Sequence, residues 1–193
     1  FLMREVAKER GLPVDRWHDN WASKSKINNT GTLYSADFDH DGCVDLLVMD
    51  FGMPAVSLFR GTPNGQFEEV EIPEIQLAIG LKHSPFPRAV IVDADNDGWE
   101  DIVFDSGIAF RNVDGQRFVS VTAQSNLTAL IAAVSSQFEK MGISTVIPGD
   151  FDRDGIVDLA LGDHSVGLHA VHIFKGLGDG RFDELPLLNS GAS

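Results

Sequence analysis

The stretch Asp37-Phe38-Asp39-His40-Asp41-Gly42-Cys43-Val44-Asp45 has aspartate at its first, third, fifth and ninth positions and glycine at its sixth. The chain repeats this pattern twice, from Asp93 to Asp101 and from Asp150 to Asp158. The first aspartates of successive copies lie 56 and 57 residues apart. A near-constant interval of this length is typical of a repeat architecture. The chain is therefore expected to hold three copies of one structural unit.

The repeated stretch has the ligand chemistry of a calcium loop. Calcium takes about six to eight oxygen ligands, and carboxylates at positions 1, 3 and 5 with a backbone carbonyl at position 7 supply most of them. An acid at position 9 allows closure within a short loop between two strands. An EF-hand instead needs glutamate at position 12, where this chain has Val48, Phe104 and Leu161.

The pattern thus predicts three Ca²⁺ sites. The side-chain ligands are expected at Asp37, Asp39, Asp41 and Asp45; at Asp93, Asp95, Asp97 and Asp101; and at Asp150, Asp152, Asp154 and Asp158. The carbonyl ligands are expected at Cys43, Trp99 and Ile156. Aspartates can also serve only as Asx turns, but three such loops would each leave about four like charges uncompensated.

Composition and charge narrow the classes of function. The chain has 193 residues, 29 acidic and 15 basic, with a formal net charge of −14. Twelve of the acids are the repeated aspartates of the three loops, and three divalent cations would bring the charge to −8. The basic residues are scattered, which argues against a nucleic-acid ligand. No apolar run approaches the roughly 20 residues of a membrane span, and the single cysteine, Cys43, has no internal disulfide partner.

Short β-type runs lie on both sides of each acidic loop, which predicts a hairpin. A third run follows in each copy, and then a turn at Asn64-Gly65, Asp114-Gly115 or Asp179-Gly180. Asn-Gly and Asp-Gly are strong signals for a tight hairpin. The fourth runs begin at an aromatic residue and are Phe67–Val70, Phe118–Val121 and Phe182–Leu185. Each unit is therefore predicted to be a four-stranded antiparallel meander.

Meanders of this kind bury their faces by stacking radially as the blades of a β-propeller. We expect an all-β chain with blades at 31–72, 88–122 and 143–187, and with residues 1–6 as the outer strand of a preceding blade. All 193 residues would then belong to one propeller domain. Closed propellers have about four to eight blades, so the remaining blades are expected from the same polypeptide or from another chain.

The long connections between blades are expected on the rim opposite the acidic loops. The spacing of apolar residues predicts a helix near 126–141, with Ser125 or Asn126 as its cap and Gly142 at its end. Residues 83–87 are expected to be extended. Aromatic, histidine and acidic side chains on this rim are candidate ligand-binding residues, namely Trp17, Trp21, Asp50, His83, Asp105 and Asp163.

The loop pattern, its period and the aromatic start of each fourth run resemble the FG-GAP/VCBS repeats of integrin-α-type β-propellers. The run Arg117-Phe-Val-Ser-Val-Thr-Ala123 is more similar to the bacterial VCBS and acidic-cartilage-protein branch than to integrins. The resemblance implies an extracellular, periplasmic or lumenal propeller, with calcium on one rim and ligands often bound on the other.

No serine or cysteine has the local pattern of a catalytic nucleophile. The leading hypothesis is a calcium-stabilised, non-catalytic module that binds protein or glycan outside the cytosol. One alternative is the propeller domain of a polysaccharide lyase or hydrolase, with its active site on the rim opposite calcium or in further blades. Another is a structural subunit of an extracellular assembly.

Overall fold

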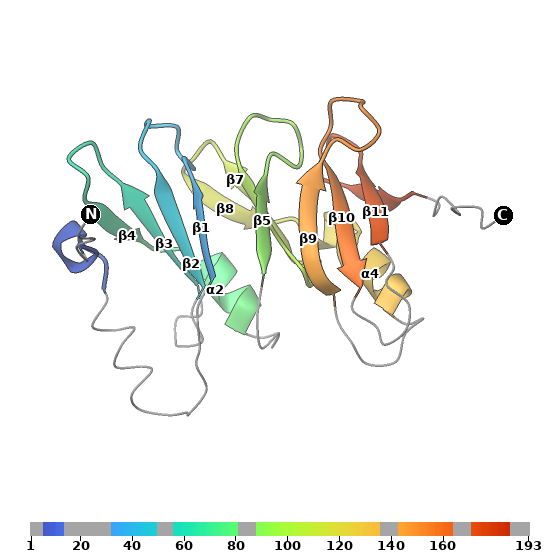
Figure 1. Ribbon diagram of the computed structural model, residues 1–193, viewed down its shortest axis with the longest axis horizontal. Helices are drawn as coiled ribbons and strands as arrows, with labels where there is room; N and C mark the ends of the chain where they lie inside the picture. The colour runs from blue at the N-terminus through green and yellow to red at the C-terminus, as the bar shows by residue number, and fades with distance from the viewer. Residues whose placement is uncertain are drawn as a thin grey trace, which may run out of the picture. The chain divides into compact units, whose positions relative to one another are not determined.

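The computed structural model describes residues 6–13, 32–49, 56–80, 88–135, 143–163 and 171–185. Within these residues the strands form three four-stranded antiparallel sheets, each in simple sequence order (Figure 1). The strands are β1 Thr32–Ala36, β2 Asp45–Met49, β3 Val56–Gly61, β4 Phe67–Val70, β5 Ala89–Val92, β6 Asp101–Phe104, β7 Ala109–Val113, β8 Arg117–Ser120, β9 Ile143–Gly149, β10 Asp158–Asp163, β11 Val171–Gly176 and β12 Phe182–Glu184. The prediction of an all-β chain built from four-stranded blades is confirmed.

The chain divides into two compact units. The first contains Phe1–Phe86 with Gly115–Arg117, and the second contains Pro87–Asp114 with Phe118–Ser193. The first unit therefore holds the sheet β1–β4, and the second holds the sheet β9–β12 and nearly all of β5–β8.

In the first unit the two middle strands carry the core. Residues of β2 alternate between buried and half-buried, and Leu47 pairs with Leu58 of β3 across the sheet. Both of these leucines are almost completely buried. Strand β1 is more exposed than β2, and the side chain of its Leu33 is 58% exposed. The buried face of this sheet therefore lies mainly over β2 and β3.

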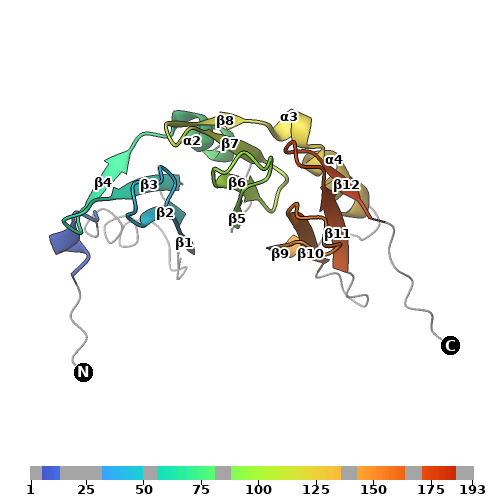
Figure 2. The same cartoon turned by 90° about the horizontal axis from the view of Figure 1, so that it is seen from above.

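In the second unit one apolar cluster joins the two sheets. It includes Val90 and Val103 from one sheet, Leu161 and Phe182 from the other, and Leu127 from a helix. Burial of side chains of this size stabilises a fold by about 1.5–3 kcal/mol each. Strands β5 and β9 lie side by side, and helix α4 (Leu127–Ser135) packs against β12 (Figure 2).

A backbone hydrogen bond also links the two sheets of this unit. The N–H of Gly180, in the turn before β12, donates to the carbonyl of Ala94 at 3.2 Å. Ala94 is the second residue of the acidic loop between β5 and β6 and is 5% exposed. The turn of one blade thus contacts the acidic loop of the blade before it.

The helical connection after the second blade was predicted in part. Helix α4 confirms the prediction over Leu127–Ser135, and residues 136–142 lie outside the described residues. A short helix, α3 (Thr122–Ser125), precedes it and ends at Asn126, whose φ is 63°. The Ser125 Oγ accepts the N–H of Leu127 at 3.4 Å. Of the two candidate caps, Ser125 therefore provides the side-chain contact, while Asn126 forms the left-handed turn between the two helices.

The connection between the first two blades contains a helix that the sequence interpretation missed. Helix α2 spans Pro73–Gly80, and the Ile72 carbonyl accepts the N–H groups of Ile75 and Gln76 at 3.1 Å. Proline is favoured at the first position of a helix because its missing N–H would have no intrahelical partner there. The side chain of Ile75 is fully buried.

Several predictions fall outside the described residues. These are residues 1–5 of the outer strand predicted at 1–6, whose last residue, Val6, is described and is not part of a strand, and the extended segment predicted at 83–87. A 3₁₀ helix, η1, occupies Lys8–Arg10 in the first connection. In the part of the chain that the structure describes, no helix combines the length and the apolar character needed to cross a membrane.

Candidate metal-binding loops

The acidic stretches form three loops between the first and second strands of the blades, here called loop 1 (37–45), loop 2 (93–101) and loop 3 (150–158). In each loop the carboxylate at position 1 accepts two backbone N–H groups, from positions 5 and 6. In loop 1 Asp37 accepts from Asp41 at 3.1 Å and from Gly42 at 3.0 Å. Loops 2 and 3 repeat both bonds at 2.9 to 3.0 Å.

The backbone of each loop takes a left-handed conformation twice. Position 6 is glycine in all copies, with φ of 86°, 93° and 87°. Glycine adopts this conformation without a steric penalty. Position 4 is also left-handed, although its residues have side chains: His40, Asn96 and Arg153. The carboxylate at position 5 then accepts the N–H of position 7, at 2.7 to 2.9 Å.

These turns bring carboxylates from separate residues together. In each loop three aspartates offer oxygen atoms that all lie within 4.8 Å of one another. Positions 1 and 3 belong to the group in every loop. Position 5 completes it in loop 1, and position 9 completes it in loops 2 and 3. The groups are Asp37, Asp39 and Asp41; Asp93, Asp95 and Asp101; and Asp150, Asp152 and Asp158.

The aspartate at position 9 has a second set of contacts, which the sequence did not reveal. In loop 1 one carboxylate oxygen of Asp45 accepts the N–H of Phe38 and the other accepts the N–H of Gly61, both at 2.9 Å. Asp101 and Asp158 repeat this arrangement with position 2 of the loop and with the third strand of the blade. All three side chains are nearly or completely buried.

Position 9 therefore ties each loop to the third strand of its own blade. Each oxygen of a carboxylate has two lone pairs, so these hydrogen bonds leave acceptor capacity for a cation. Burial raises the pKa of Asp101 to about 7, although the hydrogen bonds from the N–H groups of Asn112 and Ala94 lower this pKa. Burial also raises the pKa of Asp45. A bound cation would offset this cost of burying a negative charge.

The third strand passes very close to the loop in the first and third blades. A Cβ atom on Gly61 would lie 2.3 Å from the carbonyl oxygen of Val44, and one on Gly176 would lie 2.1 Å from that of Val157. Glycine at these positions permits the close approach. In the second blade the corresponding residue is Asn112.

A basic side chain from the third strand reaches position 3 of every loop. Arg60 contacts Asp39, Arg111 Nη1 lies 3.4 Å from Asp95 Oδ2, and Lys175 contacts Asp152. Each basic residue directly precedes the residue whose N–H binds position 9. This repeated placement is visible in the aligned copies and could have been found from the sequence.

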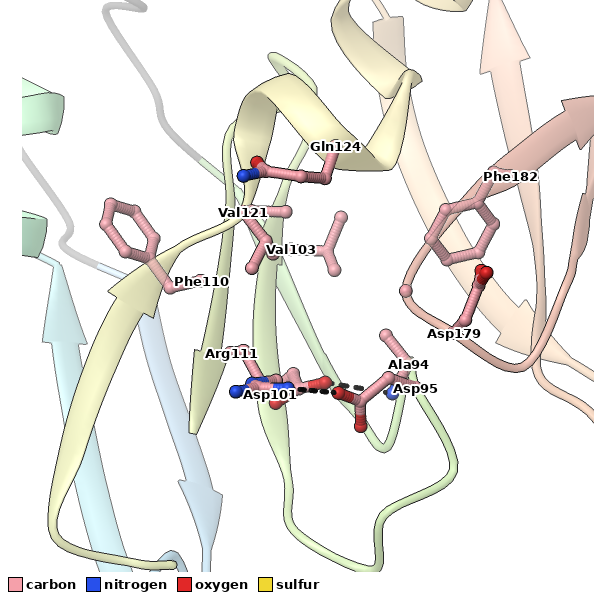
Figure 3. Close-up of a pocket in the computed structure, with 12 residues that line it drawn as sticks. Ala94, Asp95, Asp101, Val103, Phe110, Arg111, Val121, Gln124, Asp179 and Phe182 are labelled. Atoms are coloured by element: carbon pink, nitrogen blue, oxygen red, sulfur yellow. Dashed lines mark hydrogen bonds and ion pairs between the residues drawn. The ribbon is translucent and has the colours of Figure 1, made fainter. Parts of the chain in front are cut away.

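Loop 2 contains a buried carboxylate oxygen that suits a cation. Asp95 Oδ1 accepts no hydrogen bond from any described residue. It belongs to a residue that lines a cavity of about 190 Å³ in the second unit, together with Asp101, Arg111, Val121 and Phe182 (Figure 3). Burial, followed by the nearby charge of Asp97, raises the pKa of Asp95. A buried carboxylate oxygen without a hydrogen-bond donor is costly, and a calcium ion would relieve that cost, so the residues present fit the predicted metal.

The predicted ligand-binding residues of the opposite rim are described only in part. Trp17, Trp21, Asp50 and His83 lie outside the described residues, and Asp163 is described by its backbone alone at the end of β10. Asp105 follows β6, and its N–H donates to the carbonyl of Arg88 at 2.9 Å. Burial raises the pKa of Asp105 to about 6, although the backbone and charge of Arg88 lower it.

The role of position 9 can be tested without metal. We expect Asp158→Ala to lower the free energy of unfolding by about 2–5 kcal/mol, because the N–H groups of Phe151 and Gly176 would lose their acceptor. Asp158→Asn, which keeps one acceptor oxygen, should cost less. Urea denaturation in EDTA measures both. The control is Asp152→Ala in the same loop, and equal effects of Asp158→Ala and this control would contradict the tie to the third strand.

The raised pKa of Asp105 predicts a pH-dependent contribution to stability. Its folded-state value of about 6 exceeds the ordinary value of 3.8, so protonation favours the folded state. The contribution of protonated Asp105 to the free energy of unfolding is complete below about pH 4 and is lost as the pH rises through about 6. Relative to Asp105→Asn, the wild-type chain should therefore gain stability as the pH falls from about 7 to about 4.5. Denaturation in EDTA measures this, with Asp183→Asn, an exposed change, as control; parallel pH profiles for wild type and Asp105→Asn would refute it.

Comparison with curated proteins finds similarity to cartilage acidic protein 1. The chain is 26% identical to the Homo sapiens protein over 147 residues, which are 73% of this chain and 21% of that protein. It is also 26% identical to the Mus musculus protein, over 73% of this chain and 22% of that protein. The chain thus spans about a fifth of the length of these relatives.

Among solved structures, the chain is similar to a lectin from Agrocybe aegerita, reported to recognise non-reducing terminal N-acetylglucosamine. The TM-score is 0.53 and the sequence identity 18%, over 84% of this chain and 39% of the lectin chain. At this identity the similarity shows the fold. Residues 37–104, from loop 1 through β6, match the model of the FG-GAP-like repeat. The resemblance seen in the acidic loops is therefore confirmed, and residues 37–104 are similar to an FG-GAP-like repeat.

Proposed function

We propose that this chain is a calcium-stabilised segment of one extracytoplasmic β-propeller domain and that it acts as a non-catalytic binding module for carbohydrate or protein. The observation that carries the proposal is the threefold gathering of carboxylate oxygens within 4.8 Å. Like charges at this spacing repel strongly unless a cation lies between them. Three oxygen-rich groups of this kind suit calcium better than softer metals.

The place of the loops supports a structural role for the metal. Each loop joins the first two strands of a blade, and its position 9 holds the third strand through a backbone hydrogen bond. A cation bound by the loop would therefore stabilise the contact of three strands. Extracellular calcium modules commonly have dissociation constants of about 10⁻⁴ to 10⁻³ M, which requires the calcium concentrations found outside the cytosol.

Carbohydrate is the ligand class to test first, because the lectin that shares this fold is reported to recognise a sugar. The residues proposed for recognition are those of the rim opposite the loops: Trp17, Trp21, Asp50, His83, Asp105 and Asp163. Further blades, from the same polypeptide or another chain, are part of this proposal. The curated relatives extend well beyond the part that this chain covers, which is about a fifth of their length.

Removal of calcium should lower the thermal stability of the chain. We expect EDTA to reduce the melting temperature of the calcium-loaded protein by several degrees, since ligand that binds only the folded state stabilises it. Restoring calcium in excess should reverse the shift. Differential scanning calorimetry measures this, and a variant with Asp37→Asn, Asp93→Asn and Asp150→Asn together is the control that should respond little. An identical melt with and without EDTA would refute calcium stabilisation.

Glycan binding should occur without turnover. We expect the purified chain to bind a subset of glycans on an array in calcium, and the bound oligosaccharides to be recovered at their original length by mass spectrometry. Shortened or unsaturated products would instead indicate the hydrolase or lyase alternative. Binding to no glycan would overturn the carbohydrate part of the proposal.

A further inference from the structure

We propose that the three loops bind calcium in a fixed order, loop 2 first and loop 3 last, and that the basic residue of each third strand sets this order by competing with the ion. The inference rests on the proposed calcium binding and adds to it a difference between the sites. The three loops share the backbone hydrogen bonds to positions 1, 5 and 9, so they can be compared with one another. They differ at position 3, which accepts the N–H of position 5 at 3.4 Å in loop 1 and at 3.2 Å in loop 3.

Loop 3 has the strongest internal counter-ion. Lys175 Nζ contacts Asp152 and also lies 2.6 Å from Asp154 Oδ2. These are positions 3 and 5, which both supply predicted calcium ligands. A calcium ion entering loop 3 must therefore displace one ammonium group from two carboxylates at once.

Loop 1 is intermediate. Arg60 contacts Asp39 at position 3 and also donates to the carbonyl of Gly115, which belongs to the same compact unit. Its side chain is 21% exposed. Arg60 is thus held from two directions, but it contacts one predicted calcium ligand where Lys175 contacts two.

Loop 2 has the weakest internal counter-ion. Arg111 Nη1 lies 3.4 Å from Asp95 Oδ2, at the long end of ion-pair geometry, and its side chain is 46% exposed. The other oxygen, Asp95 Oδ1, is buried without a hydrogen bond from any described residue. Arg111 also lines the cavity beside Asp95 (Figure 3), so it has room to move when an ion enters. In loop 2 an ion can therefore bind Asp95 Oδ1 without first displacing the side chain of Arg111 from that oxygen.

The charges encoded around each loop give the same order. Loop 2 has a fifth acid, Glu100 at position 8, and Arg111 opposes its acids from the third strand. Loop 3 has four acids, which Lys175 opposes from the third strand and Arg153 opposes from position 4. The predicted carboxylate ligands number four in every loop, so these loops differ in the charges around the ligands, which attract or repel an ion at short range. The local charge thus agrees with the contact geometry in ranking loop 2 above loop 3.

Competition has a limited size, because the basic side chains are partly exposed. Ion pairs between partly exposed groups are weak, so their displacement changes the affinity for calcium by at most about fivefold. The counter-ion also keeps the carboxylates of loop 3 partly compensated in the absence of metal. Loop 3 should consequently depend least on calcium for its shape, and loop 2 most.

The order can be measured with calcium titrations of the full 193-residue chain by isothermal calorimetry. We expect a fit with three binding phases whose dissociation constants differ by about fivefold or less, with Asp93→Asn removing the tightest and Asp150→Asn removing the weakest. Trp99 at position 7 of loop 2 gives a second readout, since its indole can sensitise the emission of terbium bound there. Sensitised emission should saturate before terbium binding is complete, and Trp99→Phe should abolish that early signal. Loss of the weakest phase in Asp93→Asn would overturn the order.

The role of the basic residue is tested by Lys175→Met, which removes the charge and keeps much of the side-chain length. We expect the weakest phase to tighten by about three- to fivefold. Arg117→Met is the matched control, because Arg117 is an exposed basic residue of β8 outside the loops, and it should leave that phase unchanged. Calcium binding with equal affinity in Lys175→Met and wild type would overturn the inference and leave the proposed function standing. Absence of calcium binding in the wild type would overturn both.

Discussion

The interaction on which each blade depends is the pair of backbone hydrogen bonds accepted by the aspartate at position 9. One oxygen holds the second residue of the acidic loop, and the other holds the third strand, so a single side chain fixes the loop against the sheet. Asp45 and Asp158 are fully buried and Asp101 is 3% exposed. A buried carboxylate normally disfavours folding. Two N–H donors reduce that cost, and the proposed cation would reduce it further, which would couple the shape of the loop to metal binding.

The same arrangement explains why strand and loop sequences repeat while the connections between blades differ. The loop requires glycine at position 6, acids at four positions and a close approach of the third strand, as at Gly61 and Gly176. The connections carry no such requirement, and they contain η1, α2 and the pair α3 and α4. A helix there needs only an apolar contact with its blade, which Ile75 and Leu127 illustrate by their complete or nearly complete burial.

The sequence was sufficient for features that depend on local pattern. Alternating apolar runs, Asn-Gly and Asp-Gly turns and the spacing of aspartates predicted the sheets and the acidic loops. Contacts between distant residues were not predictable in this way. The partner of Asp45 in the third strand is a backbone N–H 16 residues away, and any residue except proline carries that donor. Helix α2 was missed because Pro73 and Glu74 also suit a loop, and its apolar face becomes clear only when Ile75 is seen to be buried.

The hydrogen bond from Gly180 to the carbonyl of Ala94 connects the acidic loop of one blade to the next blade. Ala94 is also the residue whose N–H binds Asp101, so its peptide groups connect loop 2 to its own sheet and to the next one. Local opening of loop 2 would break both contacts together. Proteins open in contiguous cooperative segments, and this shared residue places parts of two sheets in one such segment. A tandem array built on contacts of this kind gains cooperativity between repeats from the backbone, without requiring any particular side chain at the junction.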